Sequence, residues 1–285
     1  MKTILVTGAN GFIGQHLLKY LKGYKVVAAD RSDFDLTDLI SMRAFFKMHN
    51  PDIVINLAAN KSRGASFEDF RQMIEVNLLG ALNILEASVS CSSIKHFIFI
   101  GSAEEYGDSE APFFEEQKEK PASAYAYSKT ASKILLETLS RHQAIPFTYL
   151  RPTLVYGPNQ GEEMFLPALI KSLRSEKRFQ LTKGEQVRDY LHVKDLCGAI
   201  LKVIEKPKEA IGHVYNVGSG EVKSIGDVAK FVSQKLNVED LLDIGAIPYR
   251  ENEIFDYRVS IDKIREDLGW VPMTSIEEGL LDLLS

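Results

Sequence analysis

Short apolar segments alternate with amphipathic segments over the first half of the chain. The amphipathic segments have the apolar spacing of helices and lie at Phe12–Gly23, at roughly Phe67–Ser90 and around Lys129. This alternation predicts an α/β fold, a doubly wound parallel sheet of Rossmann type with helices on both faces. The apolar segments are nearly continuous, as strands buried on both faces require. They are Thr3–Gly8, Tyr24–Asp30, Asp52–Ala59, Lys95–Ser102 and Phe147–Pro152.

The pattern changes after Pro152, where proline, glycine and charged residues become frequent and short strand-like and helix-like segments mix. We therefore expect two parts: a dinucleotide-binding Rossmann domain over residues 1–152, and a smaller mixed α/β lobe over residues 153–285 that binds the substrate. No flexible linker separates the two parts, so they are expected to share a cleft. Strands from the second part can return to the sheet.

Composition excludes several functional classes. The 285 residues are 45% hydrophobic and 26% charged, and the net charge of −5 comes without a basic stripe, so we expect no nucleic-acid partner. The six histidines form no H-x-x-x-H pair, so no metal site is predicted. Cys91 and Cys197 are interpreted as buried reduced thiols, which fits a cytoplasmic protein. We also expect no membrane span and no signal peptide, because no apolar run is long enough and the chain opens directly into a strand.

Three glycines, Gly8, Gly11 and Gly14, follow the first predicted strand at steps of three. A strand that runs through a glycine turn into a helix directs backbone N–H groups and the positive end of the helix dipole at an anion. Glycine also lets a diphosphate approach the backbone closely. The spacing is G-x-x-G-x-x-G and not G-x-G-x-x-G, so a turn that needs glycine only for packing is the alternative interpretation.

Asp30, at the end of the second predicted strand, favours the dinucleotide interpretation. A carboxylate at this place accepts hydrogen bonds from ribose hydroxyls and repels a 2′-phosphate, which favours NAD. Arg31 follows directly and can neutralise such a phosphate, so the choice between NAD and NADP stays open. Asp35 and Leu36 are candidates for an adenine contact, with a plain helix start in the next two residues as the alternative.

A tyrosine and a lysine, Tyr125 and Lys129, lie four residues apart in a predicted helix, so their side chains meet on one face, whereas Tyr127 points elsewhere. An ammonium group beside a phenol favours the phenolate, which makes the tyrosine a usable acid or base near neutral pH. The spacing is common on helices. Here the spacing indicates a catalytic pair, because it follows a dinucleotide loop and a strand that ends in Ser102.

These features together resemble the extended short-chain dehydrogenase/reductase family, also called the NAD-dependent epimerase/dehydratase family. The resemblance covers nearly the whole chain and implies a bound NAD or NADP and a nucleotide-sugar substrate. It implies that Tyr125 exchanges a proton with a sugar oxygen, that Ser102 binds the same oxygen, and that Lys129 holds the nicotinamide ribose. The motifs that carry it are the three glycines, Asp30, "NLAA" at 56–59, Ser102, Tyr125-x-x-x-Lys129 and "LRP" at 150–152.

The resemblance also implies two sets of binding residues. The cofactor set is Gly8, Gly11, Phe12, Ile13, Gly14, Asp30, Arg31, Asp35, Leu36, Leu57, Ala58, Ala59, Tyr125, Lys129 and Pro152. The substrate set is Ser102, Glu104, Arg188 and Arg250. Arginine suits a diphosphate because its planar fork makes paired charge-assisted hydrogen bonds. A surface ion pair is the alternative role for each arginine, and His192 is expected to pack at the boundary between the lobes.

The segment Ser102–Ala103–Glu104–Glu105 distinguishes the reactions of this family. The sugar-nucleotide 4,6-dehydratases that the sequence resembles use an acid and a glutamate after the catalytic hydroxyl, and here Ala103 replaces the acid. Glu104 matches the glutamate and either orients the sugar or has a structural role. Glu105 falls where relatives carry an apolar residue, and we expect it to turn toward the protein or the solvent.

The sequence therefore favours an NAD(P)H-dependent reductase of a nucleotide-linked 4-keto-6-deoxysugar, with hydride transfer at carbon 4. Later segments resemble the CDP-sugar 4-reductases of the abequose or paratose synthase type, with GDP-4-keto-6-deoxymannose reductases as a second neighbour. The main alternative is a nucleotide-sugar 4-epimerase, followed by a 4,6-dehydratase and a non-catalytic NAD(P) sensor. Relatives pair through the helix that carries Tyr125, so a homodimer is expected.

Overall fold

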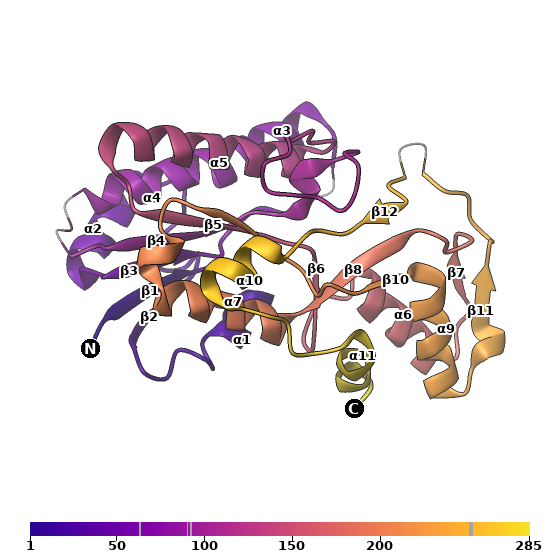
Figure 1. Cartoon of the computed structure of the whole chain (residues 1–285). Coiled ribbons are helices and arrows are strands. Elements are labelled where there is room, and N and C mark those ends of the chain that lie inside the picture. Colours follow the sequence, from indigo (N-terminus) through magenta and orange to yellow (C-terminus); the bar gives the residue numbers. More distant parts are fainter. Residues whose placement is uncertain (63, 90, 92, 251–252) are drawn as a thin grey trace.

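The computed structural model describes the chain except for residues 63, 90, 92 and 251–252. Its main sheet has six strands in the order β2-β1-β3-β4-β5-β9, and every neighbouring pair is parallel. This confirms the predicted Rossmann-type sheet, and Figure 1 shows it between two layers of helices. The strands are β1 (Thr3–Thr7), β2 (Lys25–Ala29), β3 (Ile53–Asn56), β4 (His96–Ile100), β5 (Phe147–Pro152) and β9 (Val214–Val217).

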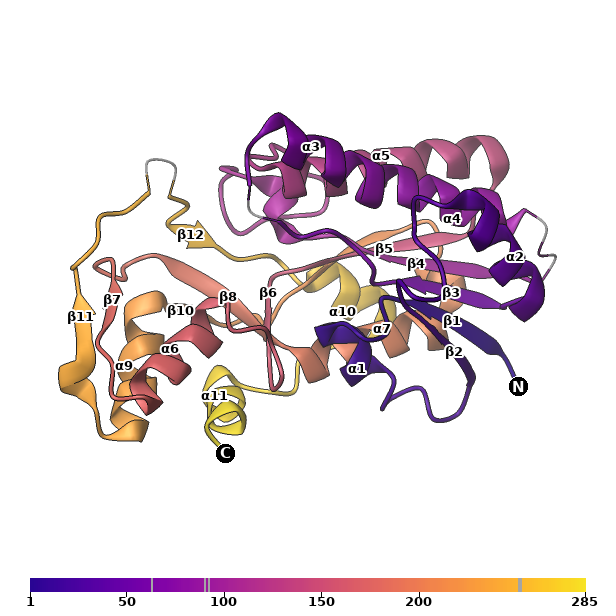
Figure 2. The ribbon, with the colours of Figure 1, turned by 180° about the vertical axis from the view of Figure 1, so that it is seen from behind.

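Side chains of successive residues in each strand pack on opposite faces, as the pleat requires. In β1, Ile4 and Val6 join the core under α1 (Phe12–Leu17), α7 (Val193–Glu205) and α10 (Asp262–Leu268). Leu5 joins the core on the other face. That face is covered by α2 (Leu39–His49), α4 (Gly80–Ser88) and α5 (Ala124–Gln143), which Figures 1 and 2 show on one side of the sheet.

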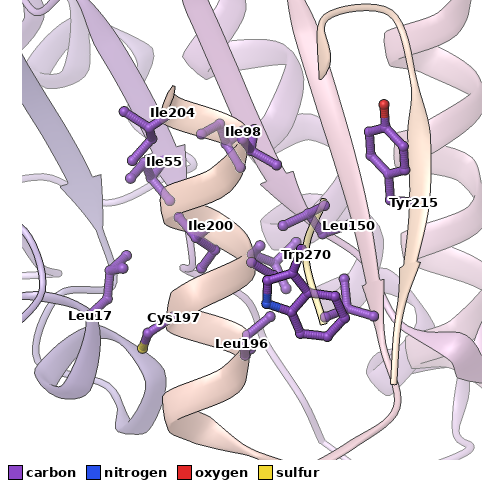
Figure 3. Packing of buried hydrophobic residues seen from close by; sticks show 14 of the residues in the cluster. Leu17, Ile55, Ile98, Leu150, Leu196, Cys197, Ile200, Ile204, Tyr215 and Trp270 are labelled. Atoms are coloured by element: carbon purple, nitrogen blue, oxygen red, sulfur yellow. The ribbon is translucent and has the colours of Figure 1, made fainter. Parts of the chain in front are cut away.

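Figure 3 shows part of the first of these cores, where Ile200 and Ile204 of α7 lie beside Ile55 and Ile98 of the sheet. Trp270 is buried in the same core, just after Gly269 caps α10. Both cysteines are buried and free, as predicted. None of the helices in the described part of the chain is both long and apolar enough to span a membrane.

Three of the predicted elements differ from the observed ones. The first helix ends at Leu17 and not at Gly23, because the chain tightens there into turns in which Lys19 and Tyr20 donate to carbonyls three residues earlier. The third strand ends at Asn56, so residues 57–59 form a loop. The long helix predicted over 67–90 is observed as α3 (Phe67–Met73), a π-helical turn η1 (Ile74–Leu79) and α4, with Ser90 outside the described residues.

The second half of the chain contributes to both parts of the molecule. β9 returns to the main sheet beside β5, and α7 and α10 cover that sheet. The remaining elements form a smaller lobe beyond the carboxyl ends of the strands (Figures 1 and 2). They are β6 (Leu154–Tyr156), α6 (Phe165–Arg174), β7 (Phe179–Leu181), β8 (Val187–His192), β10 (Val222–Ser224), α9 (Ile225–Leu236), η3 (Glu239–Leu241), β11 (Leu242–Ile244), β12 (Asp256–Tyr257) and α11 (Ile276–Leu284). The short helix α8 (Pro207–Ala210) instead packs with α7 and α10 beside the main sheet.

Candidate active site

A groove of about 950 Å³ lies at the carboxyl ends of β1, β2 and β3. Gly8 has a φ of +66°, and a Cβ on it would stand 2.8 Å from the backbone nitrogen of Ala58. At Gly14 a Cβ would overlap the backbone oxygens of Gly8 and Ala9. The glycines thus allow a tight turn and close backbone packing at the start of α1. Their absent side chains leave the kind of cradle that a diphosphate requires.

Most of the residues predicted to bind the cofactor line this groove. Phe12 and Ile13 instead pack against the core beneath α1, and Gly14 is buried in the helix, so their predicted contact is at most through the backbone. Pro152 is a buried residue at the end of β5. The predicted residues in the lining are Gly8, Gly11, Asp30, Arg31, Asp35, Leu36, Leu57, Ala58 and Ala59.

Asp30 is held at the groove by its neighbours. Its carboxylate accepts hydrogen bonds from the backbone and hydroxyl of Ser32, at 2.7 and 2.6 Å, and from the Asn10 amide. These hydrogen bonds, those from Ser32 first, lower the pKa of Asp30. Arg31 is directed to Asp35, with 3.0 Å between Nε and Oδ2. The Asp30 carboxylate and the Arg31–Asp35 ion pair therefore all line the groove.

Tyr125 and Lys129 lie on one face of α5, as predicted, with Lys129 Nζ 5.8 Å from the centre of the Tyr125 ring. The helix starts after Ser123, whose side chain accepts from the backbone N–H of Ala126. Lys129 is buried and donates from Nζ to the carbonyl oxygen of Ile100 at 2.7 Å. Burial lowers the pKa of Lys129 to about 8, and Glu105 opposes this shift. The lysine is therefore mostly protonated at neutral pH.

Ser102 begins a single 3₁₀ turn, η2 (Ala103–Tyr106), at the end of β4. Its hydroxyl accepts from the backbone N–H of Glu104 at 3.1 Å. Tyr257, from β12 of the smaller lobe, is buried, and burial raises the pKa of its hydroxyl, which Ser102 opposes. Residues from both lobes thus meet at the hydroxyl that was predicted to be catalytic.

Glu105 turns into the protein and is completely buried. The carboxylate accepts from the backbone N–H of Ser102 at 2.9 Å and from Nε of Arg151 at 2.9 Å. Burial raises the pKa of Glu105, while the charge of Arg151 opposes that rise. Arg151 is also buried, and its other side pairs with Glu119. A buried ion-pair network therefore lies directly behind the serine.

A second cavity of about 250 Å³ lies between Glu104 of η2, the start of α5 and the smaller lobe. Its lining includes Glu104, Arg188 and Arg250, the predicted substrate residues beyond Ser102, together with Tyr257. The structure brings these side chains to one place, although they come from distant segments. In this arrangement Arg188 donates to the carbonyls of Val187 and Ile254 and pairs with the Glu253 carboxylate, and Arg250 is exposed.

Two site residues escaped the sequence analysis. Asn77 lies in the π-helical turn η1, which is a feature common at functional sites. Its side chain bonds the backbone of Asn60 beside the groove and the hydroxyl of Ser128 on α5, both within 2.9 Å. An isolated asparagine in an apolar helix was the available signal. Tyr257 is the other, and no local pattern distinguishes it from a core tyrosine.

The remaining histidine and metal predictions concern the surroundings of the site. His192 is buried at the start of α7, where its ring packs edge-on against Tyr156, and burial lowers its pKa. Within the described residues, no group of three or more histidine, cysteine or acidic side chains is placed to hold a metal ion.

Comparisons with known proteins agree with this geometry. The model of the NAD dependent epimerase/dehydratase family matches residues 4–218. A trifunctional UDP-glucose 4,6-dehydratase/UDP-4-keto-6-deoxy-D-glucose 3,5-epimerase/UDP-4-keto-L-rhamnose-reductase from Arabidopsis thaliana is 27% identical over 309 aligned residues. The alignment covers 98% of this chain but 46% of the plant protein, so the chain spans about half the length of that relative.

Two solved structures share the fold over nearly their whole length. UDP-glucose 4-epimerase from Thermotoga maritima, solved with UDP-glucose, has a TM-score of 0.90 and 28% identity, and covers 99% of this chain and 97% of its own. RMD from Pseudomonas aeruginosa, complexed with NADPH, has a TM-score of 0.88 and 27% identity, and covers 100% of this chain and 96% of its own. The cofactor is accordingly NAD or NADP, and the glycine cradle fits it.

Proposed function

Since the chain belongs to the NAD-dependent epimerase/dehydratase family, we propose that it is an NAD(P)H-dependent reductase of a nucleotide-diphosphate 4-keto-6-deoxysugar. Relatives that act on nucleotide sugars support the substrate class. Residues 1–152 would supply the cofactor site and residues 153–285 most of the nucleotide-sugar site. When bound, the reduced nicotinamide supplies a hydride to the carbonyl carbon at position 4 of the sugar.

Side chains of this protein supply the proton for the new hydroxyl group and the positive charge beside the proton donor. Tyr125 donates a proton to the oxygen that becomes a hydroxyl, and Ser102 stabilises that oxygen by a hydrogen bond while charge develops on it. Lys129, positively charged and 5.8 Å from the Tyr125 ring, favours the phenolate that remains. Arg188 and Arg250 line the cavity beside Glu104 and would bind the diphosphate.

One observation carries the choice against elimination: Ala103 stands between Ser102 and Glu104. Ala103 is completely buried and packs in a cluster with Tyr106 and Phe113. It has no proton to give to a leaving hydroxyl, so a 4,6-dehydratase would lack its acid. Glu104 stays at the cavity, where it would orient the sugar.

We further propose that NAD(H) is preferred over NADP(H). Asp30 presents its carboxylate at the groove, and Arg31, which could neutralise a 2′-phosphate, is paired with Asp35. A 2′-phosphate would meet the negative charge of Asp30 and would compete with Asp35 for the Arg31 guanidinium.

The proposal includes a cytoplasmic homodimer. Buried free cysteines are consistent with a reducing compartment. The surface formed by α3 and α5 supports the dimer, because it exposes large apolar side chains of Phe67, Phe70, Tyr127 and Ile134. Phe70 and Tyr127 lie across the two helices with ring centres 6.4 Å apart. Exposed apolar groups on adjacent helices are typical of an interface.

The deciding experiment follows the absorbance of NADH or NADPH in the presence of CDP-, GDP-, dTDP- and UDP-linked 4-keto-6-deoxysugars. We expect loss of one reduced cofactor for each sugar reduced with one of these substrates. Interconversion of UDP-glucose and UDP-galactose without net cofactor consumption would instead support the epimerase. Release of a 4-keto-6-deoxysugar from a nucleotide glucose without added reductant would contradict the argument from Ala103.

A further inference from the structure

Glu105 carries a buried carboxylate, and the burial of this charged group needs an explanation. The side chain is completely buried, Oε1 lies 2.9 Å from the backbone nitrogen of Ser102 and 3.0 Å from the hydroxyl of Tyr149, and Oε2 accepts from Arg151 Nε at 2.9 Å. Removing a carboxylate and a guanidinium from water is costly, and well-packed apolar residues of similar volume are often as stable. The Glu105–Arg151 ion pair therefore contributes little to stability, and the contacts of Glu105 indicate another role.

The contacts of Glu105 lead to both Ser102 and Lys129. Ser102 is bound directly through its backbone N–H. The Tyr149 hydroxyl also lies 2.9 Å from the carbonyl oxygen of Lys129. Its single hydrogen is therefore shared between this carbonyl and the Glu105 carboxylate. Lys129 in turn donates from Nζ to Ile100, two residues before Ser102. The carboxylate, the serine backbone and the lysine are thus linked into one buried set.

The end of β4 has space for this carboxylate because residue 101 is glycine. A Cβ on Gly101 would overlap Oε1 of Glu105 and the ring of Tyr149. Gly101 is not among the residues with positive φ, so the close approach and not the backbone conformation requires glycine here. The sequence therefore provides both the acid and the space for it.

The charge of Glu105 also acts on Lys129. Burial lowers the pKa of Lys129 to about 8, and Glu105 raises it. The other groups that face this region are Tyr125 one turn earlier on α5, Tyr149 on β5, and Arg151, whose charge is paired with Glu105 and Glu119. Glu105 is the acidic group that favours the ammonium form.

We propose that Glu105 is a positioning residue for the reaction, which holds the backbone of Ser102 in place and keeps Lys129 both oriented and charged. It rests on the proposed function only for the roles of Ser102 and Lys129. Glu105 acts through these residues from behind the site, and its carboxylate is directed away from the cavity that Glu104 lines.

The test compares Glu105→Gln with Glu119→Gln, because both carboxylates bind the same Arg151 guanidinium. Glu119 does so from the far side, together with Lys133. We expect Glu105→Gln to lower kcat about 10- to 100-fold at nearly unchanged KM, as for a misplaced catalytic group. Its activity should also be lost at lower pH than in the wild type, because Lys129 loses its proton more easily. Glu119→Gln should keep kcat and the pH profile, with a comparable loss of thermal stability.

Equal kcat values and equal pH profiles for the two variants would overturn the proposal, since Glu105 would then be only a counter-ion of Arg151. If Glu105→Gln does not fold, Gly101→Ala decides, because the added Cβ would displace Oε1 of Glu105: a folded variant with wild-type kcat and pH profile would also overturn it. If the wild type turns over no nucleotide sugar, the proposed function fails separately. The pH dependence of NADH affinity then replaces kcat: an earlier alkaline loss in Glu105→Gln supports the proposal, and identical curves overturn it.

Discussion

Lys129 Nζ donates a 2.7 Å hydrogen bond to the carbonyl oxygen of Ile100, so the α5 helix is fixed to the end of β4 at the point where the site begins. Ile100 is a strand residue, and strands of a doubly wound sheet are among its most rigid parts. Because this bond anchors the ammonium group, its position relative to Tyr125 is set by the sheet and not by side-chain flexibility. The proposed proton transfer by Tyr125 depends on this rigid arrangement.

Replacing Tyr125 by phenylalanine removes the proposed proton donor without changing the packing of the ring. We expect kcat to fall about 10²- to 10⁴-fold, the usual contribution of general acid catalysis. NADH binding, measured by fluorescence, should be retained. Tyr127→Phe is the matched control, because Tyr127 is two residues away on the same helix and 47% exposed. Similar kcat values for the two variants would exclude Tyr125 as the donor.

Asp30→Ser should change cofactor preference. The substitution removes the negative charge at the groove and keeps a hydrogen-bonding side chain for the ribose. We expect the ratio of NADH to NADPH affinity to fall about 10- to 100-fold, as for loss of a charged hydrogen bond. Calorimetric titration with each cofactor measures the ratio. An unchanged ratio would mean that the 2′ position lies away from Asp30.

Arg188→Met should weaken substrate binding more than catalysis. Arg188 lines the small cavity and is largely buried, so a diphosphate would bind it with little screening. We expect KM for the nucleotide sugar to rise about 10- to 100-fold with kcat changed about twofold or less. Arg178→Met is the control, since Arg178 forms an exposed ion pair with Asp243 in the same lobe. A rise in KM for Arg178→Met alone would contradict the assignment.

His96 should make the protein less stable in acid. The Thr148 hydroxyl gives its hydrogen to the Ala210 carbonyl, so it accepts from Nε2 of His96, whose Nδ1 has no partner in the described structure. Burial, with a smaller effect of Lys2, lowers the pKa of His96 to about 4. The unfolded chain therefore takes up this proton first, so stability falls as pH drops from the ordinary histidine value near 6.5 toward 4.

The size of this effect follows from the two pKa values. Between about pH 7 and about pH 5 the wild type should lose about 2 kcal/mol of unfolding free energy through His96. Urea unfolding at both pH values measures the loss. In His96→Gln the pH dependence should be smaller by that amount, whereas an equal dependence would show that other groups cause it.

Ile134→Glu should dissociate the proposed dimer. Ile134 is half exposed on α5, and a buried carboxylate at an interface has no partner to offset its desolvation. Sedimentation velocity should show a dimer for the wild type and a monomer for the variant. Ile40→Glu, on α2, is the control, since Ile40 is equally apolar and more exposed but lies on another surface. If the wild-type protein is a monomer, the proposed dimer is wrong.

The sequence indicated the sheet and the groove well because both depend on local patterns. Buried parallel strands are short apolar runs, and the end of each run places a loop at the groove. Leu57 to Ala59 were predicted as strand and are loop, yet they still line the groove. The length of the first helix was less accessible, because the tightening after Leu17 depends on tertiary contacts.

The surroundings of Ser102 were harder to predict, because they assemble distant segments. The sequence left open whether Glu105 turns toward the protein or the solvent, and its burial becomes clear only when Arg151, 46 residues later, lies beside it. Tyr257 reaches Ser102 from the opposite half of the chain. Sequence spacing says little about such contacts, since loop closure brings together residues at any separation.

The return of β9 to the main sheet has a consequence for how such proteins can be altered. A hypothetical exchange of everything after residue 152 for the corresponding part of a relative would also exchange the strand that pairs with β5 and the two helices that cover the sheet. The incoming segment must rebuild half of the cofactor domain's core. Changes of specificity are therefore easier to obtain by replacing individual loops than by transplanting the whole lobe as a cassette.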